Sequence, residues 1–311
     1  MRTRMLSLAL VLVAVSQPVV NGDEMKPKWK WEKQFYLECS VASKDNFHLE
    51  TELNPETTKT SMRLVFKVTP SLNTDGTVKL VHEIKQIQYL ESTEDKSKEK
   101  KLLSKMIGGK FTTNRAKDGA LTPIQGMAEL TGKVFSAAST DDPVKKQTAQ
   151  FENLFATMFE SLLSDAYFPL APGSEPDDAI ALKQTLSFAG FLTMKSEKKY
   201  AATQAVVIDG KSYLGYRMTA KSSIHIPEKP STLIPFKVVD VKLPKPIQHS
   251  AEMAFDPTVG RAQRVVVKIS GDMSITIDVE GMKLKLTGNE ERTLTILFSD
   301  DDPETRSKPK Q

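Results

Sequence analysis

Residues 29–41 read WKWEKQFYLECSV and show clearly the pattern from which the fold class is inferred. Its side chains alternate between two sets along the chain. A β-strand turns successive side chains to opposite faces, so a pattern with period two predicts a half-buried strand. The set assigned to the buried face comprises Trp29, Trp31, Phe35, Leu37, Cys39 and Val41, and the polar set comprises Lys30, Glu32, Gln34, Glu38 and Ser40.

The same alternation recurs along the chain, separated by turn sequences. It is seen at 47–53, 62–68, 78–84, 200–208, 212–226, 265–269, 273–279, 282–286 and 294–298, the runs at 273–279 and 282–286 being joined through Gly281. Asp75-Gly76 and Asp209-Gly210 are expected to form tight hairpin turns, because glycine tolerates a positive φ. Ile87 and Tyr89 have the opposite parity to the residues before them, which predicts a β-bulge near Lys85 or Gln86.

One segment, 143–164, has helical periodicity instead. Asp142 can cap a helix, and Pro143 suits a first helical turn, where its missing N–H costs nothing. Apolar residues then recur every three or four positions and form one broad stripe, typical of a helix that faces a core. The alternative is a helix that covers an apolar ligand groove. The stripe comprises Phe151, Leu154, Phe155, Met158, Phe159, Leu162 and Leu163.

These patterns predict a mainly β (α+β) fold. We expect a curved antiparallel sheet or half-barrel of many meandering strands, packed on one long amphipathic helix. The expected division is a signal peptide at 1–22, a β-rich domain at 23–298 and a flexible charged tail at 299–311. The proline-rich connection near 165–178 is the candidate boundary between two halves of the β-rich domain.

The first residues have the features of a secretory signal peptide. Arg2 and Arg4 precede an apolar run at 5–15, and cleavage is expected between Gly22 and Asp23. The apolar run is shorter than the roughly 20 residues that a membrane-spanning helix needs. We therefore expect an exported protein, periplasmic or fully secreted, without a transmembrane anchor in its mature chain.

The net charge and the cysteine content argue against a nucleic-acid partner and against an intramolecular disulfide. Without Arg2 and Arg4, the 43 basic residues become 41 against 39 acidic ones, a net charge of +2. That near balance disfavours a nucleic-acid partner, which would require a basic face. Cys39 is the only cysteine, so it has no partner for an intramolecular disulfide and is expected to be a buried core residue.

No motif indicates catalysis. No serine stands in a Gly-x-Ser-x-Gly elbow, and the four histidines lack the close spacing of a metal site. Structural roles are expected for His48, His82, His225 and His249. The sequence thus predicts a protein that is not an enzyme and needs no cofactor or metal.

Several short motifs resemble a family of uncharacterised secreted bacterial domains. They are TDGTV at 74–78, GKF and KDGALTPIQG within 109–126, the Phe-rich helix, FPLAPG at 168–173 and FDPTVGR at 255–261. More distantly, strands around an apolar helix resemble the half-barrel of periplasmic lipoprotein carriers. That resemblance implies an apolar groove, and it carries no catalytic residue.

The leading hypothesis is a non-enzymatic binding module whose groove accepts a lipid-like or peptide ligand. The candidate groove residues are Phe151, Leu154, Phe155, Met158, Phe159 and Leu162. A second hypothesis is a structural or interaction domain of the cell envelope that binds a protein partner through exposed strand edges. A secreted hydrolase is a third, since folding alone can assemble catalytic groups.

Overall fold

The structure is a computed structural model that describes residues 27–52, 56–135, 142–171, 178–188, 192–228, 236–303 and 305. The expected signal peptide at 1–22, with Gly22 and Asp23 at its cleavage site, lies outside these residues and stays a prediction. So do parts of the 165–178 connection and most of the charged tail after 303.

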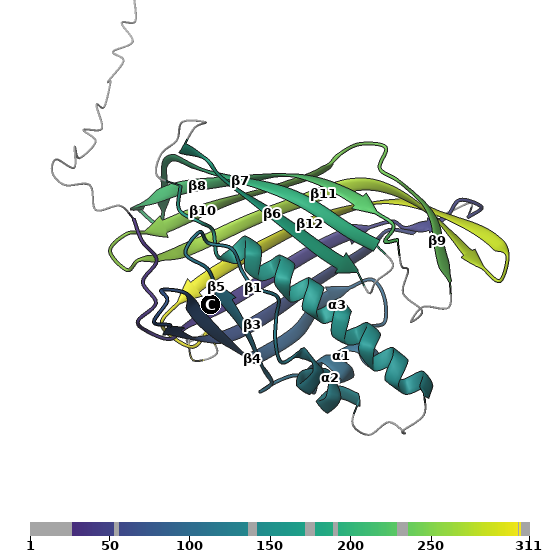
Figure 1. The fold of residues 1–311 in the computed structure, drawn as a ribbon, viewed down its shortest axis with the longest axis horizontal. Helices are drawn as coiled ribbons and strands as arrows, with labels where there is room; N and C mark the ends of the chain where they lie inside the picture. Colours follow the sequence, from purple (N-terminus) through teal and green to yellow (C-terminus); the bar gives the residue numbers. More distant parts are fainter. Residues whose placement is uncertain are drawn as a thin grey trace, which may run out of the picture.

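Twelve strands within the described residues form one antiparallel sheet, and three helices accompany it (Figure 1). The strands are β1 (Phe35–Asp45), β2 (His48–Leu49), β3 (Thr58–Leu72), β4 (Val78–Ser92), β5 (Lys110–Arg115), β6 (Ile180–Phe188), β7 (Leu192–Ile208), β8 (Lys211–His225), β9 (Lys237–Lys242), β10 (Ile247–Asp256), β11 (Arg261–Val279) and β12 (Met282–Ser299). The helices are α1 (Ser97–Ser104), α2 (Met127–Phe135) and α3 (Asp142–Ala166).

The two halves of the sequence form the two halves of this sheet. The strand order is β5-β4-β3-β1-β12-β11-β10-β8-β7-β6, with β2 paired to β12 and β9 paired to β11. The halves meet where β1 pairs with β12, in a ladder that runs from Tyr36–Ser299 to Asp45–Glu290. All strands therefore belong to one continuous sheet, joined through strands from opposite ends of the chain.

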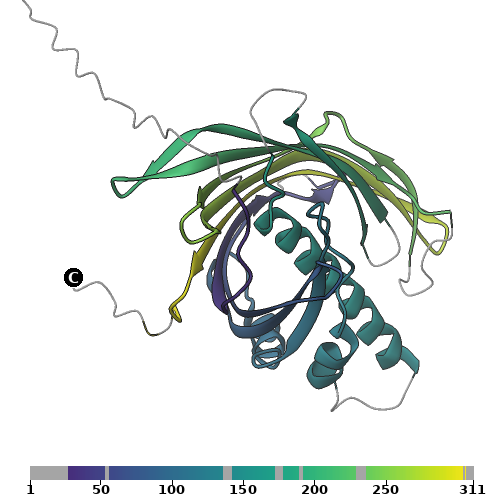
Figure 2. The same cartoon turned by 60° about the vertical axis from the view of Figure 1, so that its left-hand side comes forward.

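The sheet curves around α3. Figure 2 shows the helix in the hollow of the sheet, and α1 and α2 lie near its N-terminal part in both views. Sheets twist because L-residues favour a right-handed strand twist, and long strands wrap readily over a helix. This arrangement confirms the expected curved, mainly β fold with one long helix.

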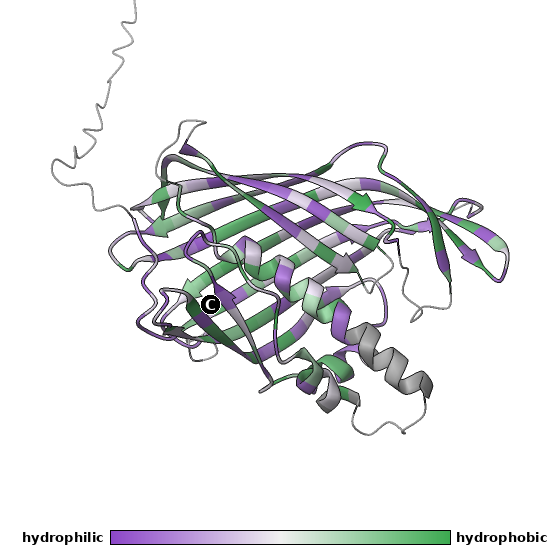
Figure 3. Ribbon diagram, viewed as in Figure 1, coloured by the Kyte–Doolittle hydropathy of each residue, from purple (hydrophilic) through white to green (hydrophobic). Residues whose placement is uncertain are grey.

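The core lies between the concave face and the C-terminal part of α3. Phe35, Leu37 and Cys39 are all fully buried, as the alternation predicted, and hydropathy alternates along most strands (Figure 3). Phe159 of α3 stacks on Phe111 with ring centroids 5.0 Å apart and meets Phe66 edge-on at 5.5 Å. Such aromatic geometry adds to the burial of apolar area.

Local details confirm some predictions and correct others. The ladder between β3 and β4 skips Lys85, so the predicted bulge is present, and Asp209-Gly210 joins β7 to β8 with φ values of 49° and 76°. The strand predicted at 47–53 is wrong in length, since within its described part, 47–52, the paired strand is His48–Leu49 alone; the backbone N–H of Glu52 bonds instead to the carbonyl of Leu49 in a turn.

The elements that were not predicted from the sequence include β6, β9, β10 and α2. Strand β6 pairs with β7 and forms one edge of the sheet. None of the helices within the described residues is both long and apolar enough to cross a membrane.

Candidate functional site

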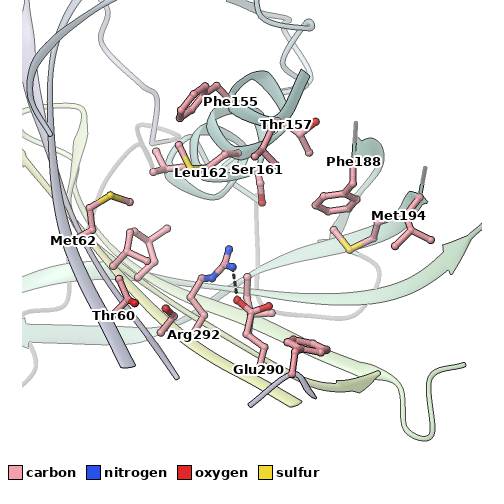
Figure 4. Close-up of a pocket in the computed structure, with 18 of the residues that line it drawn as sticks. Thr60, Met62, Phe155, Thr157, Ser161, Leu162, Phe188, Met194, Glu290 and Arg292 are labelled. Atoms are coloured by element: carbon pink, nitrogen blue, oxygen red, sulfur yellow. Dashed lines mark hydrogen bonds and ion pairs between the residues drawn. The ribbon is translucent and has the colours of Figure 1, made fainter. Parts of the chain in front are cut away.

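An open cavity of about 990 Å³ lies between α3 and the concave face of the sheet. Figure 4 shows side chains of α3 facing side chains of the sheet across this space. Its sheet wall is formed by β1, β3, β4 and β6–β12, and α1, α2 and α3 contribute the opposite wall. Most of the lining side chains are aliphatic, methionine or aromatic.

The alternation of the strands produces the apolar wall. Along β11 the residues of one parity, Ile269, Met273, Ile275 and Ile277, all line the cavity. Nearer the core the same parity continues with Val265 and Val267, which are fully buried. One set of side chains therefore changes from packed core to cavity wall along a single strand, because α3 covers only part of its length.

Helix α3 presents two adjacent apolar seams. Phe159, Leu163 and Ala166 are fully buried in the core, whereas Met158 and Leu162 line the cavity. Positions three and four apart share a helix face, so each seam follows from helical geometry alone. The broad stripe in the sequence thus serves both the core and the cavity.

The predicted groove residues divide accordingly. Leu154, Phe155, Met158 and Leu162 line the cavity, and Leu154 remains 47% exposed. Phe159 packs in the core. Phe151 belongs to α3, but its side chain lies outside the described residues. Cys39 is a buried free cysteine.

A buried polar cluster fixes the C-terminal end of α3 to the sheet. Asp165 lines the cavity, and its Oδ1 accepts a hydrogen bond from Lys198 Nζ of β7 at 2.6 Å. Its Oδ2 lies 3.1 Å from His249 Nε2 of β10. Lys198 Nζ also donates to Ser164 Oγ at 2.6 Å. The cluster therefore links the helix to two strands.

Charge compensation in this cluster is strong. Burial by itself raises the pKa of Asp165, but the adjacent Lys198 and His249 outweigh it and lower that pKa to about 2. A buried carboxylate needs such partners, because an unpaired charge in an apolar interior is costly. Asp165 is consequently ionised at neutral pH.

An aromatic cluster fills the end of the fold near the start of β1. Trp29 and Trp31 stack with centroids 5.1 Å apart, and Trp29 Nε1 donates to the Phe168 carbonyl at 2.8 Å. The Arg115 guanidinium lies 5.6 Å from the Trp31 ring, and burial lowers the pKa of Arg115 to about 10. Residues before β1 thus cover this end of the core.

The concave face also carries an ion pair. Glu290 and Arg292, two residues apart on β12, line the cavity and bond to each other, as the dashed line in Figure 4 shows. Their side chains are 32% and 43% exposed, respectively. Elsewhere on β12, positions of the same parity as Glu290 and Arg292 carry mostly apolar side chains.

Sequence reasoning missed every charged member of the site. Asp165, Lys198 and His249 come from three elements, and no local pattern indicates that folding joins them. The signal available was a charge at a position whose parity demands an apolar residue, as for Lys198 in β7 and Arg292 in β12. His82 and His249 are buried and hydrogen-bonded, to Tyr167 Oη and Asp165, which accords with structural roles.

Comparisons with known proteins assign no family. No family model and no curated protein matches the chain, so the resemblance to uncharacterised secreted domains stays a prediction. Among solved structures, a lipovitellin structure on lipid–protein interactions matches with TM-score 0.43 and 9% identity, over 90% of this chain and 27% of that one. The chain thus spans about a quarter of the lipovitellin chain.

Two further likenesses are weaker. DynF, from the dynemicin biosynthesis pathway of Micromonospora chersina, matches with TM-score 0.22 and 10% identity, over 89% of this chain and 86% of that one. A putative outer membrane lipoprotein-sorting protein domain from Vibrio parahaemolyticus matches with TM-score 0.14 and 8% identity, over 87% of each chain. At these TM-scores none of the likenesses supports an argument about function, which must come from the cavity itself.

Proposed function

We propose that this chain is a non-enzymatic binding protein that holds a lipid-like ligand between α3 and the concave face of its sheet. The signal-like pattern at 1–22 makes it, in this proposal, an exported protein. The observation that carries the proposal is the cavity of about 990 Å³ with a mostly apolar lining.

Size and chemistry both favour this reading. Ligand pockets usually measure about 300–1,000 Å³ and are lined mainly by apolar side chains with a few polar groups. The present cavity is at the upper end of that range. Contact between water and apolar walls is unfavourable, so an apolar ligand that replaces this water binds favourably.

A direct test is to purify the protein without detergent, extract it with organic solvent and analyse the extract by mass spectrometry. A stoichiometric amphiphile or apolar small molecule is the expected result. Binding of a fluorescent fatty-chain probe to delipidated protein then provides an affinity for comparing variants.

Two neighbouring substitutions on β11 give a matched pair for that assay. Ile269→Trp places a larger side chain in the cavity wall, whereas Lys268→Trp places the same side chain on the exposed opposite face. We expect Ile269→Trp to weaken probe binding and Lys268→Trp to leave it unchanged. Equal affinities in both variants and the unmodified protein would exclude this cavity as the binding site.

A further inference from the structure

The Glu290–Arg292 pair interrupts an apolar column of β12. Residues of the same parity on either side of it include Leu286 and Leu294, and both line the cavity with the pair. Both side chains remain partly exposed, so the ion pair itself contributes little to stability. Their position suggests a role in binding rather than in packing.

Polar side chains extend from Arg292 across the neighbouring strands. The ladders place Ser43 of β1 beside Arg292, and Thr60 of β3 beside Ser43. Neighbouring strands are about 4.8 Å apart, so these three side chains form a short polar row on the cavity wall. All three line the cavity.

Glu290 lies in an acidic environment. Asp45 of β1 is its direct cross-strand neighbour, and burial, followed by the charges of Glu290 and Glu94, raises the pKa of Asp45. Like charges directly opposite each other destabilise a sheet. The nearby Lys96 bonds to Glu94 and lies 3.7 Å from Glu99. Carboxylates thus outnumber cations here, which favours a positively charged ligand group beside Glu290.

Arg292 offers the complementary site. A guanidinium has five N–H donors in a planar fork that suits phosphate. Among the described residues, Glu290 is its only hydrogen-bond partner, through Nη2. Figure 4 shows the guanidinium directed into the space below α3. Its remaining donors can therefore reach an anionic group of a ligand in the cavity.

From this geometry we propose that Glu290 and Arg292 form a head-group subsite for a zwitterionic amphiphile of the phosphocholine or phosphoethanolamine class, with Asp45 adding negative charge beside Glu290 from outside the cavity lining. The phosphoryl group bonds to Arg292, the ammonium group lies against Glu290, and the apolar chain occupies the rest of the cavity. At about 30 Å³ for each water-sized group, the cavity accommodates on the order of 30 such groups, enough for one fatty chain and a small head. This inference rests on the proposed function.

Four amphiphiles with the same dodecyl chain provide the test: dodecylphosphocholine, dodecyl phosphate, dodecyltrimethylammonium and the uncharged dodecanol. Each is titrated into the delipidated protein by calorimetry, the three charged or zwitterionic amphiphiles below their micellar concentrations and dodecanol below its solubility limit. We expect dodecylphosphocholine to bind about tenfold more tightly than dodecanol, because it alone satisfies both charges of the pair.

Variants then assign the preference to the pair. Arg292→Met should reduce dodecylphosphocholine to the affinity of dodecanol, and Glu290→Gln should weaken dodecylphosphocholine while strengthening dodecyl phosphate. Arg63→Met is the control, because Arg63 pairs with Glu38 at 2.7 Å outside the cavity lining. Binding of dodecanol to each variant shows that the cavity remains intact.

The outcomes separate this inference from the proposed function. If dodecanol and dodecylphosphocholine bind equally, or Arg292→Met leaves the preference unchanged, the head-group subsite is wrong while the apolar cavity stands. Tighter binding of dodecyl phosphate or dodecyltrimethylammonium than of dodecylphosphocholine also overturns the zwitterionic assignment. If none of the four binds, the proposed function itself fails.

Discussion

Asp165 holds the C-terminal end of α3 in place through charge. It bonds to Lys198 at 2.6 Å and faces His249 at 3.1 Å, and all three side chains are buried. Breaking a buried ion pair leaves an uncompensated charge, which costs more than the pair contributes to stability when it is intact. The cluster therefore determines how firmly one wall of the cavity is held.

We expect Asp165→Asn to lower the free energy of unfolding by about 3–5 kcal/mol, because the buried Lys198 would lose its carboxylate partner. Denaturation in urea, monitored by circular dichroism, measures the change. The matched control is Asp240→Asn. The Asp240 carboxylate is 48% exposed and lies 3.5 Å from Lys242 Nζ, so this substitution should have little effect on the free energy of unfolding. Similar losses in both variants would contradict the role assigned to burial.

His82 makes stability depend on pH. Burial lowers its pKa to about 3 from an ordinary value near 6.5. Below pH 6.5 the His82 imidazole is protonated in the unfolded chain but stays neutral in the folded chain. The free energy of unfolding therefore falls as the pH drops towards 3. Asp165 also lowers the free energy of unfolding as the pH falls, but over a lower pH range, since its pKa of about 2 lies below its ordinary value of 3.8.

Replacing His82 by Phe keeps a ring against Phe111, on which the imidazole stacks at 4.9 Å, and removes the titration. Between pH 6 and 4 we expect the slope of unfolding free energy against pH to decrease by up to about 1.4 kcal/mol per pH unit. Urea titrations at three pH values provide the slopes. Parallel slopes for the variant and the unmodified protein would rule out this source of acid sensitivity.

At the scale of elements, the ladder between β7 and β8 contains a close backbone approach. A Cβ atom at Gly215 would lie 2.1 Å from the Gln204 carbonyl oxygen, where the register shifts between Thr203 and Val206. No side chain fits at that distance without moving the strand. Glycine is thus required by the bulge of the neighbouring strand.

Gly215→Ala is expected to destabilise the fold by about 1–3 kcal/mol, as overpacking does. Gly132→Ala serves as its control, since Gly132 lies inside α2 with open space around it. There alanine should stabilise by about 0.5–1 kcal/mol, because glycine is a poor helix former. Thermal unfolding of both variants tests the opposite signs.

The sequence predicts elements well where the signal is local. Alternation placed the long strands, and the parity change after Ile84 located the bulge at Lys85. β6 was missed although Ile180, Leu182 and Leu186 alternate, because the polar Gln184 breaks the pattern. The short α2 was missed because Gly132 interrupts its helical spacing.

Features that depend on distant pairing had no such signal. The ladder between β1 and β12 joins residues more than 240 positions apart, and nothing within either strand specifies its partner. The candidate site follows from that pairing, since Asp45 faces Glu290 only across it. The sequence therefore indicated an apolar helix that could cover a ligand, whereas the charges of the site emerged only from the folded sheet.

For the whole molecule, one continuous sheet implies one cooperative unit. Trp29 contacts Tyr167, Phe255 and Phe298, so the aromatic cluster connects early, middle and late segments of the chain. Unfolding of one half would expose both the β1–β12 ladder and this cluster. The two halves are thus expected to unfold together.

Tryptophan fluorescence and far-ultraviolet circular dichroism test that expectation, because the former reports on the aromatic cluster and the latter on all strands. We expect both signals to give the same midpoint and the same slope in a urea titration. Separate midpoints would show that the two halves of the sheet are independent domains.

Cys39 lies in β1, with β3 on one side and β12 on the other, and it is completely buried. Burial also raises the pKa of its thiol, so little of the reactive thiolate forms at neutral pH. As the chain has one cysteine, any thiol alkylation or disulfide exchange must occur at its sulfur atom. The rate at which a thiol reagent labels Cys39 therefore measures how often β1 separates from its neighbouring strands. A ligand that contacts both halves of the sheet should lower this labelling rate.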